Sequence, residues 1–133
     1  MAHDPRSLGP DVLAFLDERH LATFTTLRPD GSPHVAPVGF SYDPATGIAR
    51  VISFAGARKV RNLREAGPRG GLAVLSQVDG GRWLSLEGRA VVTDDPDRVA
   101  LAVESYARRY RQPGERPDRV AIEVTVTRVL GRG

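Results

Sequence analysis

The chain has 133 residues, of which 41% are hydrophobic and 26% are charged, and its net charge at pH 7 is +3. That length allows a single domain, residues 1–133, to bury a core, and the balance of apolar and charged residues excludes a disordered chain. Because there is no cysteine, disulfide scaffolds, thiolate metal sites and cysteine nucleophiles are excluded as well.

Neither a membrane nor a nucleic acid is an expected partner. The segment 1–6 lacks the apolar core of a signal peptide, and no apolar run approaches the ~20 residues of a membrane span. Acidic residues are spread among the basic ones, which form no stripe interleaved with aromatics of the kind that binds nucleic acid. We therefore expect a soluble, cytoplasmic protein.

The first half of the chain predicts one helix followed by three strands. Apolar residues on one helical stripe, with Pro10 and Asp11 suited to a first turn, predict a helix over about 10–19. Three runs rich in β-forming residues follow, with turn sequences between them. They predict strands over 21–27, 33–42 and 48–54.

The second half predicts two helices and three more strands. Val60 and Leu63 lie three apart, as in a short helix over 57–66. Asp95 before Pro96 is an N-cap followed by a residue favoured at the first helical position, which predicts a helix to about residue 110. The strands are predicted over 72–78, 82–93 and 120–129.

Six strands, nearly all joined by tight turns, favour an antiparallel sheet. In a small domain such strands readily curl into a barrel, which removes exposed edges. Most connections are too short for the crossover helices of a parallel α/β fold. The predicted fold class is mainly β: a six-stranded antiparallel barrel with short helices.

The densest cluster of charge is the segment 58–64, which contains Arg58, Lys59, Arg61 and Arg64. Lys59 is the only lysine among the 19 basic residues. Cations at a helix N-terminus oppose the helix dipole by ~0.3–1 kcal/mol each, so the cluster calls for a compensating anion. Free backbone N–H groups combined with Lys and Arg predict a phosphate site, and a solvated basic helix face is the alternative.

A proline within the strand predicted over 33–42 indicates a second candidate site. Pro37 cannot donate a ladder hydrogen bond, so this strand is expected at an edge, beside an opening where a flat heterocycle could lie. An ordinary edge strand with a bulge is the alternative. His34 could donate a proton to a substrate, although a surface histidine is the simpler interpretation. With His3 and His20 it has no metal-ligand spacing, so no metal is expected.

The only tryptophan, Trp83, follows a predicted hairpin turn at 79–81. An exposed aromatic at that position can stack on a ring or form a contact surface, and core packing is the alternative. The sequence contains no G-x-S-x-G, H-E-x-x-H, P-loop or G-x-G-x-x-G motif. Hydrolase and kinase functions therefore have no support.

Several segments together resemble one known family. A strand followed by Lys59–Arg64, then by Gly67-Pro68 and an apolar strand, resembles the phosphate-binding stretch of the pyridoxamine 5′-phosphate oxidase-like superfamily. The resemblance is greatest to its F420-dependent reductase branch and covers nearly the whole chain. The segments that carry it are 13–16, 19–22, 32–35, 74–80, 82–90 and 106–111, of which 82–90 is the most specific.

The resemblance implies a split β-barrel homodimer, similar to FMN-binding barrels, with two sites at the subunit interface. It implies the deazaflavin coenzyme F420 rather than FMN as cofactor. Many FMN-binding members have Arg or Ser two residues before the lysine and Asn-Pro after the helix. This chain has Ala57 and Gly67-Pro68 at those places.

The site residues follow from the same resemblance. Lys59 and Asn62, with Arg58 nearby, would hold the cofactor's phosphate, and Arg61 and Arg64 would meet its anionic tail. Further contacts would come from four strands, and two of them, Gln77 and Trp83, would approach from another strand or subunit. The backbone of His34, Val35, Ala36, Pro37 and Val38 would line the deazaflavin ring, and the other contacts are Ser53, Phe54, Gln77 and Trp83.

The implied activity is hydride transfer from reduced F420 to a conjugated acceptor, with biliverdin, a tetrapyrrole, as the favoured substrate and bilirubin as product. No side chain is required as a nucleophile. Two alternatives remain open on the sequence. One is an FMN- or F420-dependent reductase or oxidase with another substrate, and the other is a non-catalytic F420 carrier or sensor.

Overall fold

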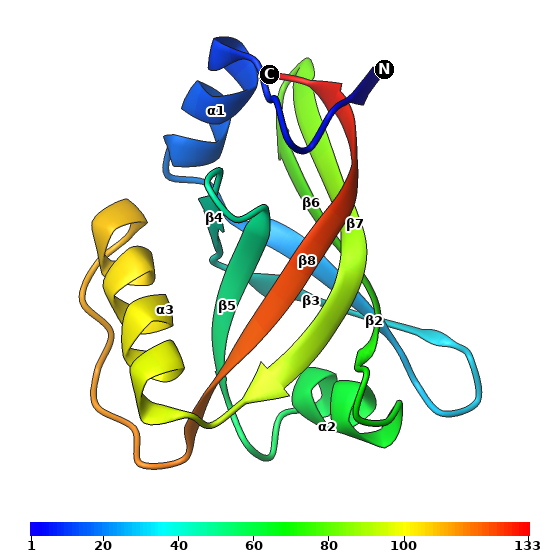
Figure 1. Ribbon diagram of the computed structural model, residues 1–133, viewed down its shortest axis with the longest axis vertical. Helices are drawn as coiled ribbons and strands as arrows, with labels where there is room; N and C mark the ends of the chain where they lie inside the picture. The colour runs from blue at the N-terminus through cyan, green and yellow to red at the C-terminus, as the bar shows by residue number, and fades with distance from the viewer.

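The computed structural model describes all residues, 1–133, as eight strands and three helices (Figure 1). The helices are α1 (Pro10–Asp17), α2 (Arg58–Glu65) and α3 (Pro96–Arg109). The strands are β1 (Ala2–His3), β2 (Ala22–Leu27), β3 (Pro33–Val38), β4 (Ser41–Asp43), β5 (Ile48–Phe54), β6 (Gly71–Asp79), β7 (Arg82–Thr93) and β8 (Arg119–Arg132). None of the helices is long and apolar enough to cross a membrane.

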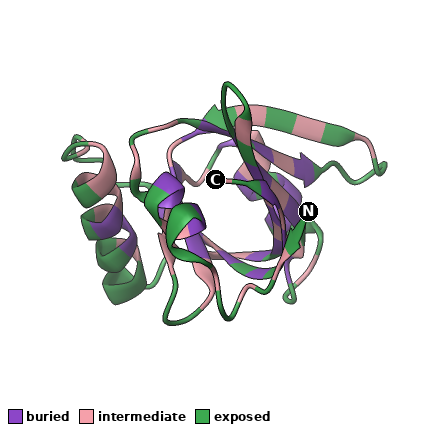
Figure 2. Ribbon diagram, turned by 90° about the horizontal axis from the view of Figure 1, so that it is seen from above, coloured by how far each residue is buried: buried purple, intermediate pink, exposed green.

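All the strands pair antiparallel, in the order β3-β2-β6-β7-β8-β5-β4, with β1 added beside the end of β8. The sheet curls on itself, and seen from above its strands form a ring (Figure 2). β3 and β4 are the two ends of the order and do not pair with each other. The fold is therefore the mainly β, split barrel with short helices that the sequence predicted.

Side chains that alternate along the strands fill the barrel, and the two shorter helices cover its ends. Phe15 and Leu16 of α1 are buried at one end, and Val60 and Leu63 of α2 are buried at the other. The three-residue spacing of Val60 and Leu63 is thus the core-facing stripe of α2. α3 lies outside the ring of strands, against β5 (Figure 2).

The predicted strand over 33–42 is broken into β3 and β4, and this is the main difference from the expected elements. The backbone groups of Phe40 bond to α3 instead of a strand, because its N–H donates to Tyr110 Oη at 3.2 Å and its carbonyl accepts from Arg109 Nη1 at 2.7 Å. A Cβ on Gly39 would lie 2.8 Å from the Tyr106 ring. The close approach of α3 therefore ends the strand at Gly39. The short strands β1 and β4 bring the count to eight instead of six.

Candidate functional site

The first turn of α2 carries two cations and no compensating acid. The helix begins after Ala57, which provides no side-chain cap, and Arg58 and Lys59 follow at once. The Lys59 side chain is half-buried, makes no hydrogen bond or ion pair, and has its pKa lowered by burial. A half-buried ammonium beside the free N–H groups of a helix is an arrangement suited to bind an anion.

Asn62 joins α2 to the barrel. Its side chain is buried; Nδ2 donates to Thr26 Oγ1 on β2 at 3.0 Å, and Oδ1 accepts from Arg58 Nη1 at 3.2 Å. Both ends of the amide are therefore used within the chain, and Asn62 orients Arg58 and the start of α2. The sequence reasoning missed Thr26. Its position could have indicated a buried polar contact, because Ala22, Phe24 and Thr26 alternate along β2 and share its inward face.

His34 on β3 lies beside the same cations. Burial, and then the charges of Arg28, Lys59 and Arg58, lower the pKa of His34, so its imidazole is neutral at neutral pH. The Nδ1 atom is buried and has no hydrogen-bond partner. Buried polar atoms are normally paired, so this nitrogen is a position that a ligand can complete.

β3 is the edge strand that Pro37 predicted, because its only neighbour is β2. Residues on a strand alternate between faces. Val35 and Pro37 are exposed on one face, whereas His34, Ala36 and Val38 turn toward the interior. Of the five predicted contacts on this strand, only these last three have side chains on the barrel side.

A second strand edge is unpaired where β5 leads into α2. β4 pairs with β5 only over residues 48–50, so residues 51–54 have β8 as their one neighbour. Ser53 is buried there, and its Oγ has no partner. Phe54 faces the other side of the strand, with the guanidinium carbon of Arg116 at 4.0 Å from its ring centroid. Ser53 thus presents an unfilled polar atom, while the Phe54 side chain is covered.

Gln77 and Trp83 do not lie with the other predicted residues. Gln77 is fully buried, and its amide donates to the Phe15 carbonyl at 2.9 Å and accepts from Arg109 at 2.5 Å. Trp83 is 38% exposed beside the β6–β7 hairpin, at the end of the barrel opposite α2 (Figure 1). Within one chain Gln77 therefore has a structural role, and Trp83 would reach a ligand near α2 only from a second copy.

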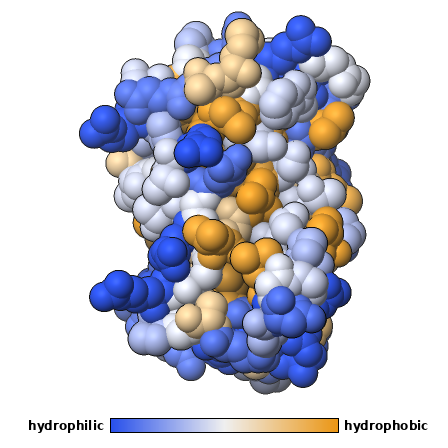
Figure 3. Space-filling view, turned by 90° about the vertical axis from the view of Figure 1, so that its right-hand side faces the viewer, coloured by the Kyte–Doolittle hydropathy of each residue, from blue (hydrophilic) through white to orange (hydrophobic).

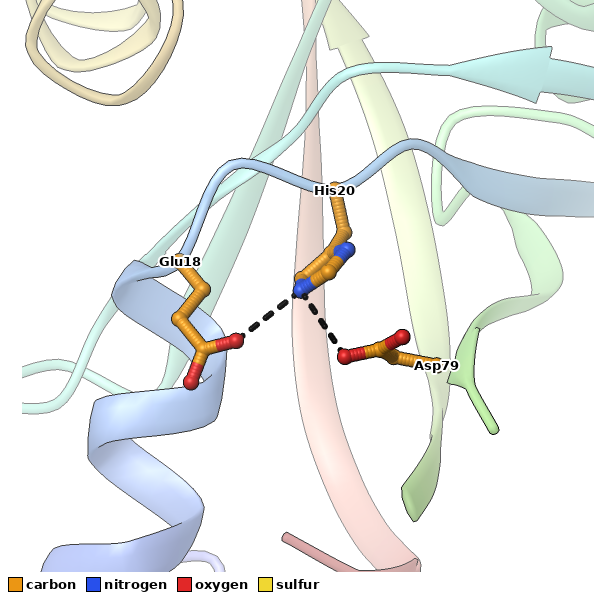
Figure 4. A group of neighbouring side chains, drawn as sticks. All are labelled: Glu18, His20 and Asp79. Atoms are coloured by element: carbon orange, nitrogen blue, oxygen red, sulfur yellow. Dashed lines mark hydrogen bonds and ion pairs between the residues drawn. The ribbon is translucent and has the colours of Figure 1, made fainter. Parts of the chain in front are cut away.

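A different cluster, which the sequence spacing did not reveal, joins α1 to the β6–β7 hairpin (Figure 4). The His20 Nε2 atom lies 3.0 Å from Glu18 Oε1 and 3.8 Å from Asp79 Oδ2. Arg82 donates two hydrogen bonds to Glu18, at 2.7 and 2.8 Å, and a third to Asp79. Because this guanidinium already neutralises the carboxylates, the cluster is an ion-pair network that fastens the hairpin to α1.

Comparisons with known proteins give a family match over most of the chain. The family model described as pyridoxamine 5′-phosphate oxidase matches residues 8–133. A protein from Mycobacterium tuberculosis (strain CDC 1551 / Oshkosh), named F420H(2)-dependent biliverdin reductase, is 58% identical over 131 residues, which are 98% of this chain and 93% of that protein.

Solved structures give the same fold. A structure described as an F420 reductase has a TM-score of 0.69 at 27% identity, covering 88% of this chain and 94% of its own. A conserved hypothetical protein from Mycobacterium tuberculosis has a TM-score of 0.77 at 20% identity, covering 95% of this chain and 85% of its own. The second likeness concerns the fold alone.

Proposed function

The chain belongs to the pyridoxamine 5′-phosphate oxidase family, and from this membership we propose that it is an F420-dependent reductase that converts biliverdin to bilirubin. One observation carries the proposal: 58% identity over 98% of the chain to a relative named for that reaction. The family match over residues 8–133 includes α2 and every strand except β1. The likeness to a structure described as an F420 reductase adds support.

The residues around α2 fit an anionic cofactor. The Lys59 ammonium has no partner in the chain and is already partly removed from water. Binding the phosphate of F420 therefore adds little to the free-energy cost of desolvating this ammonium. Arg61 and Arg64 are exposed on the same helix, where they suit the anionic tail. His34 Nδ1 and Ser53 Oγ are buried polar atoms without partners on the two unpaired edges, β3 and β5. They suit the polar edge of a flat ring.

When bound, F420 supplies the hydride, and the residues of this chain bind, orient and exclude water. Lys59 would hold the phosphate, with Arg58 oriented beside it by Asn62. His34 would act as a neutral hydrogen-bonding group, because the lowered pKa makes it a weak proton donor at neutral pH. The proton that completes the product would therefore come from elsewhere, with solvent as the simplest source.

The propionates of a tetrapyrrole would require cations near the mouth of the site. Arg28 is exposed at the end of β2, where its Nη1 donates to the Pro33 carbonyl at 2.6 Å. Its charge acts on His34, so it lies close to the β3 edge. We propose Arg28 as one of the arginines that meet a propionate.

A homodimer with the sites at its interface is part of the proposal. Apolar residues gather on the side of the molecule that carries β7 and the β2–β3 hairpin (Figure 3). The exposed side chains that form this surface include Leu27, Val35, Leu72 and Val78, which are between 42% and 64% exposed. An exposed apolar face of this kind is typical of a protein interface. A second copy packed there would also bring in a Trp83 side chain.

Cofactor titration tests the proposal. The purified chain would be titrated with F420 and with FMN, and binding followed by fluorescence. We expect F420 to bind more tightly, because its phosphate and tail engage both Lys59 and the arginines of α2. Tighter binding of FMN would contradict the proposed cofactor. The cytoplasmic location expected from the sequence remains a prediction.

A further inference from the structure

A cavity of about 420 Å³ lies between α1, β4 and α3, away from α2. It shares no residue with the site proposed for F420. Its walls combine apolar side chains, among them Leu16 and Leu101, with several polar and charged ones. Two of the polar side chains, on β4 and β5, lack the partners that buried polar groups normally have.

Arg50 of β5 is the first of them. Its side chain is only 8% exposed and makes no hydrogen bond, and its Nε atom is buried without a partner. Asp43 has the only carboxylate oxygen within 4.0 Å of Arg50, but this Oδ2 lies 3.7 Å from Arg50 Nη1, which is too long for a hydrogen bond. Glu123, opposite Arg50 on β8, is engaged by Arg98. The other oxygen of Asp43 accepts from the Ala45 N–H at 2.9 Å, within its own turn. Arg50 is therefore a buried guanidinium whose N–H groups have no hydrogen-bond acceptor in the chain.

Ser41 of β4 is the second. Ser41 and Arg50 are opposite each other in the β4–β5 register, so their side chains share one face of the sheet. The Ser41 Oγ atom is buried and has no hydrogen-bond partner. A hydroxyl and a guanidinium, side by side and both without a hydrogen bond, line the same cavity. Leaving such groups unfilled is costly, so the pair indicates a missing acceptor.

The other cations of the cavity are already engaged. Arg109 donates to the carbonyls of Glu18 and Phe40 and to Gln77. Arg108 donates to Glu104 and Ser105. Arg50 is thus the buried guanidinium in this cavity that makes no hydrogen bond, and a ligand would be anchored at Arg50 and Ser41.

The surroundings also select the class of anion. The planar fork of a guanidinium matches a carboxylate in two parallel hydrogen bonds. Asp17 and Asp43 line the cavity as well, and their charges disfavour an anion that carries two charges. Leu16 and Leu101 offer contact to an apolar body. We propose that this cavity binds a small organic monocarboxylate, with the carboxylate held by Arg50 and Ser41.

The test uses benzoate as a monocarboxylate with an apolar body, acetate as the minimal carboxylate, and inorganic phosphate, at a pH above its second pKa, as the doubly charged comparison. Each would be titrated into the full chain by calorimetry. Saturable binding of benzoate is expected, with weaker binding of acetate. Arg50→Met should weaken benzoate binding about tenfold or more, and Ser41→Ala by a smaller factor, because a charged and a neutral donor are lost.

Two controls make the result specific. Arg6→Met removes an equal charge from a side chain that is 93% exposed in the amino-terminal segment, and should leave benzoate binding unchanged. Lys59→Ala should also leave it unchanged while weakening F420 binding, which separates this proposal from the proposed function. Arg50→Met should change the stability of the unliganded chain little, because it removes both a buried charge and that charge's long ion pair with Asp43.

No saturable binding of benzoate or acetate would overturn the proposal. So would benzoate binding that is equally strong in Arg50→Met and in the parent, or saturable binding of phosphate alone. If Arg50→Met did not fold, the smaller change Ser41→Ala would decide, and unweakened binding in that variant would contradict the site.

Discussion

The Asn62 amide donates a hydrogen bond to Thr26 Oγ1 at 3.0 Å, although the two residues are 36 positions apart in the chain. This contact fixes α2 against β2 from within the core, since both residues are buried. The same amide accepts from Arg58, so it sets the position of the cations at the start of the helix. Stability and the proposed cofactor binding are therefore coupled through one side chain.

Asn62→Ala should lower the free energy of unfolding by about 1–3 kcal/mol, because the Thr26 hydroxyl is left buried without its partner. Urea unfolding measures this change. Adding Thr26→Val to the same chain should recover part of the loss, since the orphaned hydroxyl is then gone. If the changes in the free energy of unfolding simply added in the double variant, the loss of this hydrogen bond would not be the cause of the destabilisation.

Lys59→Ala should weaken F420 binding by about 1.5–3 kcal/mol, as expected for the loss of a charge-assisted hydrogen bond to a phosphate. The dissociation constant would rise about tenfold to about a hundredfold. Fluorescence titration measures it, and Arg6→Ala is the matched control for lost charge far from α2. An unchanged dissociation constant for Lys59→Ala would indicate that the basic segment is a solvated helix face and not a phosphate site.

Acid should weaken the network that fastens the β6–β7 hairpin to α1. Hydrogen bonds from Arg82, then from His20, lower the pKa of Glu18 from 4.5 to about 2. A carboxyl group whose pKa is lower in the folded than in the unfolded state stabilises the fold fully above the unfolded pKa. This stabilisation is lost as the pH falls through the folded-state pKa. The melting temperature should therefore drop between about pH 4.5 and about pH 2.

Glu18→Gln should flatten this drop, because glutamine does not titrate. Glu115→Gln is the control, since Glu115 is exposed in the loop before β8 and makes no hydrogen bond. Equal pH profiles for Glu18→Gln and the parent would show that Glu18 is not responsible.

The exposed apolar face predicts self-association. Val35→Lys on β3 and Leu72→Lys on β6 place charges on side chains that are 56% and 59% exposed. Each should shift a dimer toward monomer in light scattering coupled to size exclusion, because an unpaired charge in an interface is costly. Leu101→Lys on α3, which is 41% exposed and off this face, should not. A parent chain that is monomeric at high concentration would contradict the dimer.

Local signals predicted most of the fold. The limits of β5 and β7 coincide with the predicted strands 48–54 and 82–93, because turn sequences bound them on the chain itself. Asp95 caps α3 as expected, accepting from the Arg98 N–H at 3.0 Å. Such features depend on neighbours in sequence, which is why they could be predicted.

Long-range contacts explain the rest. The break at Gly39 depends on Tyr106 of α3 and on Tyr110 directly after it, and nothing near residue 39 indicates that a helix packs there. Gln77 was predicted at the cofactor, but Phe15 and Arg109 bind both ends of its amide inside the core. The pairing of Arg50 with Ser41 likewise requires the β4–β5 register. The basic start of α2, by contrast, was predicted because its residues are consecutive in sequence.

The most direct test is the reaction itself. The chain would be mixed anaerobically with reduced F420 and biliverdin, and the loss of biliverdin absorbance followed together with the oxidation of F420. The account predicts many turnovers, with equal amounts of biliverdin consumed and F420 oxidised. F420 binding without any loss of biliverdin would contradict it and would indicate a carrier or sensor, or a reductase with another acceptor.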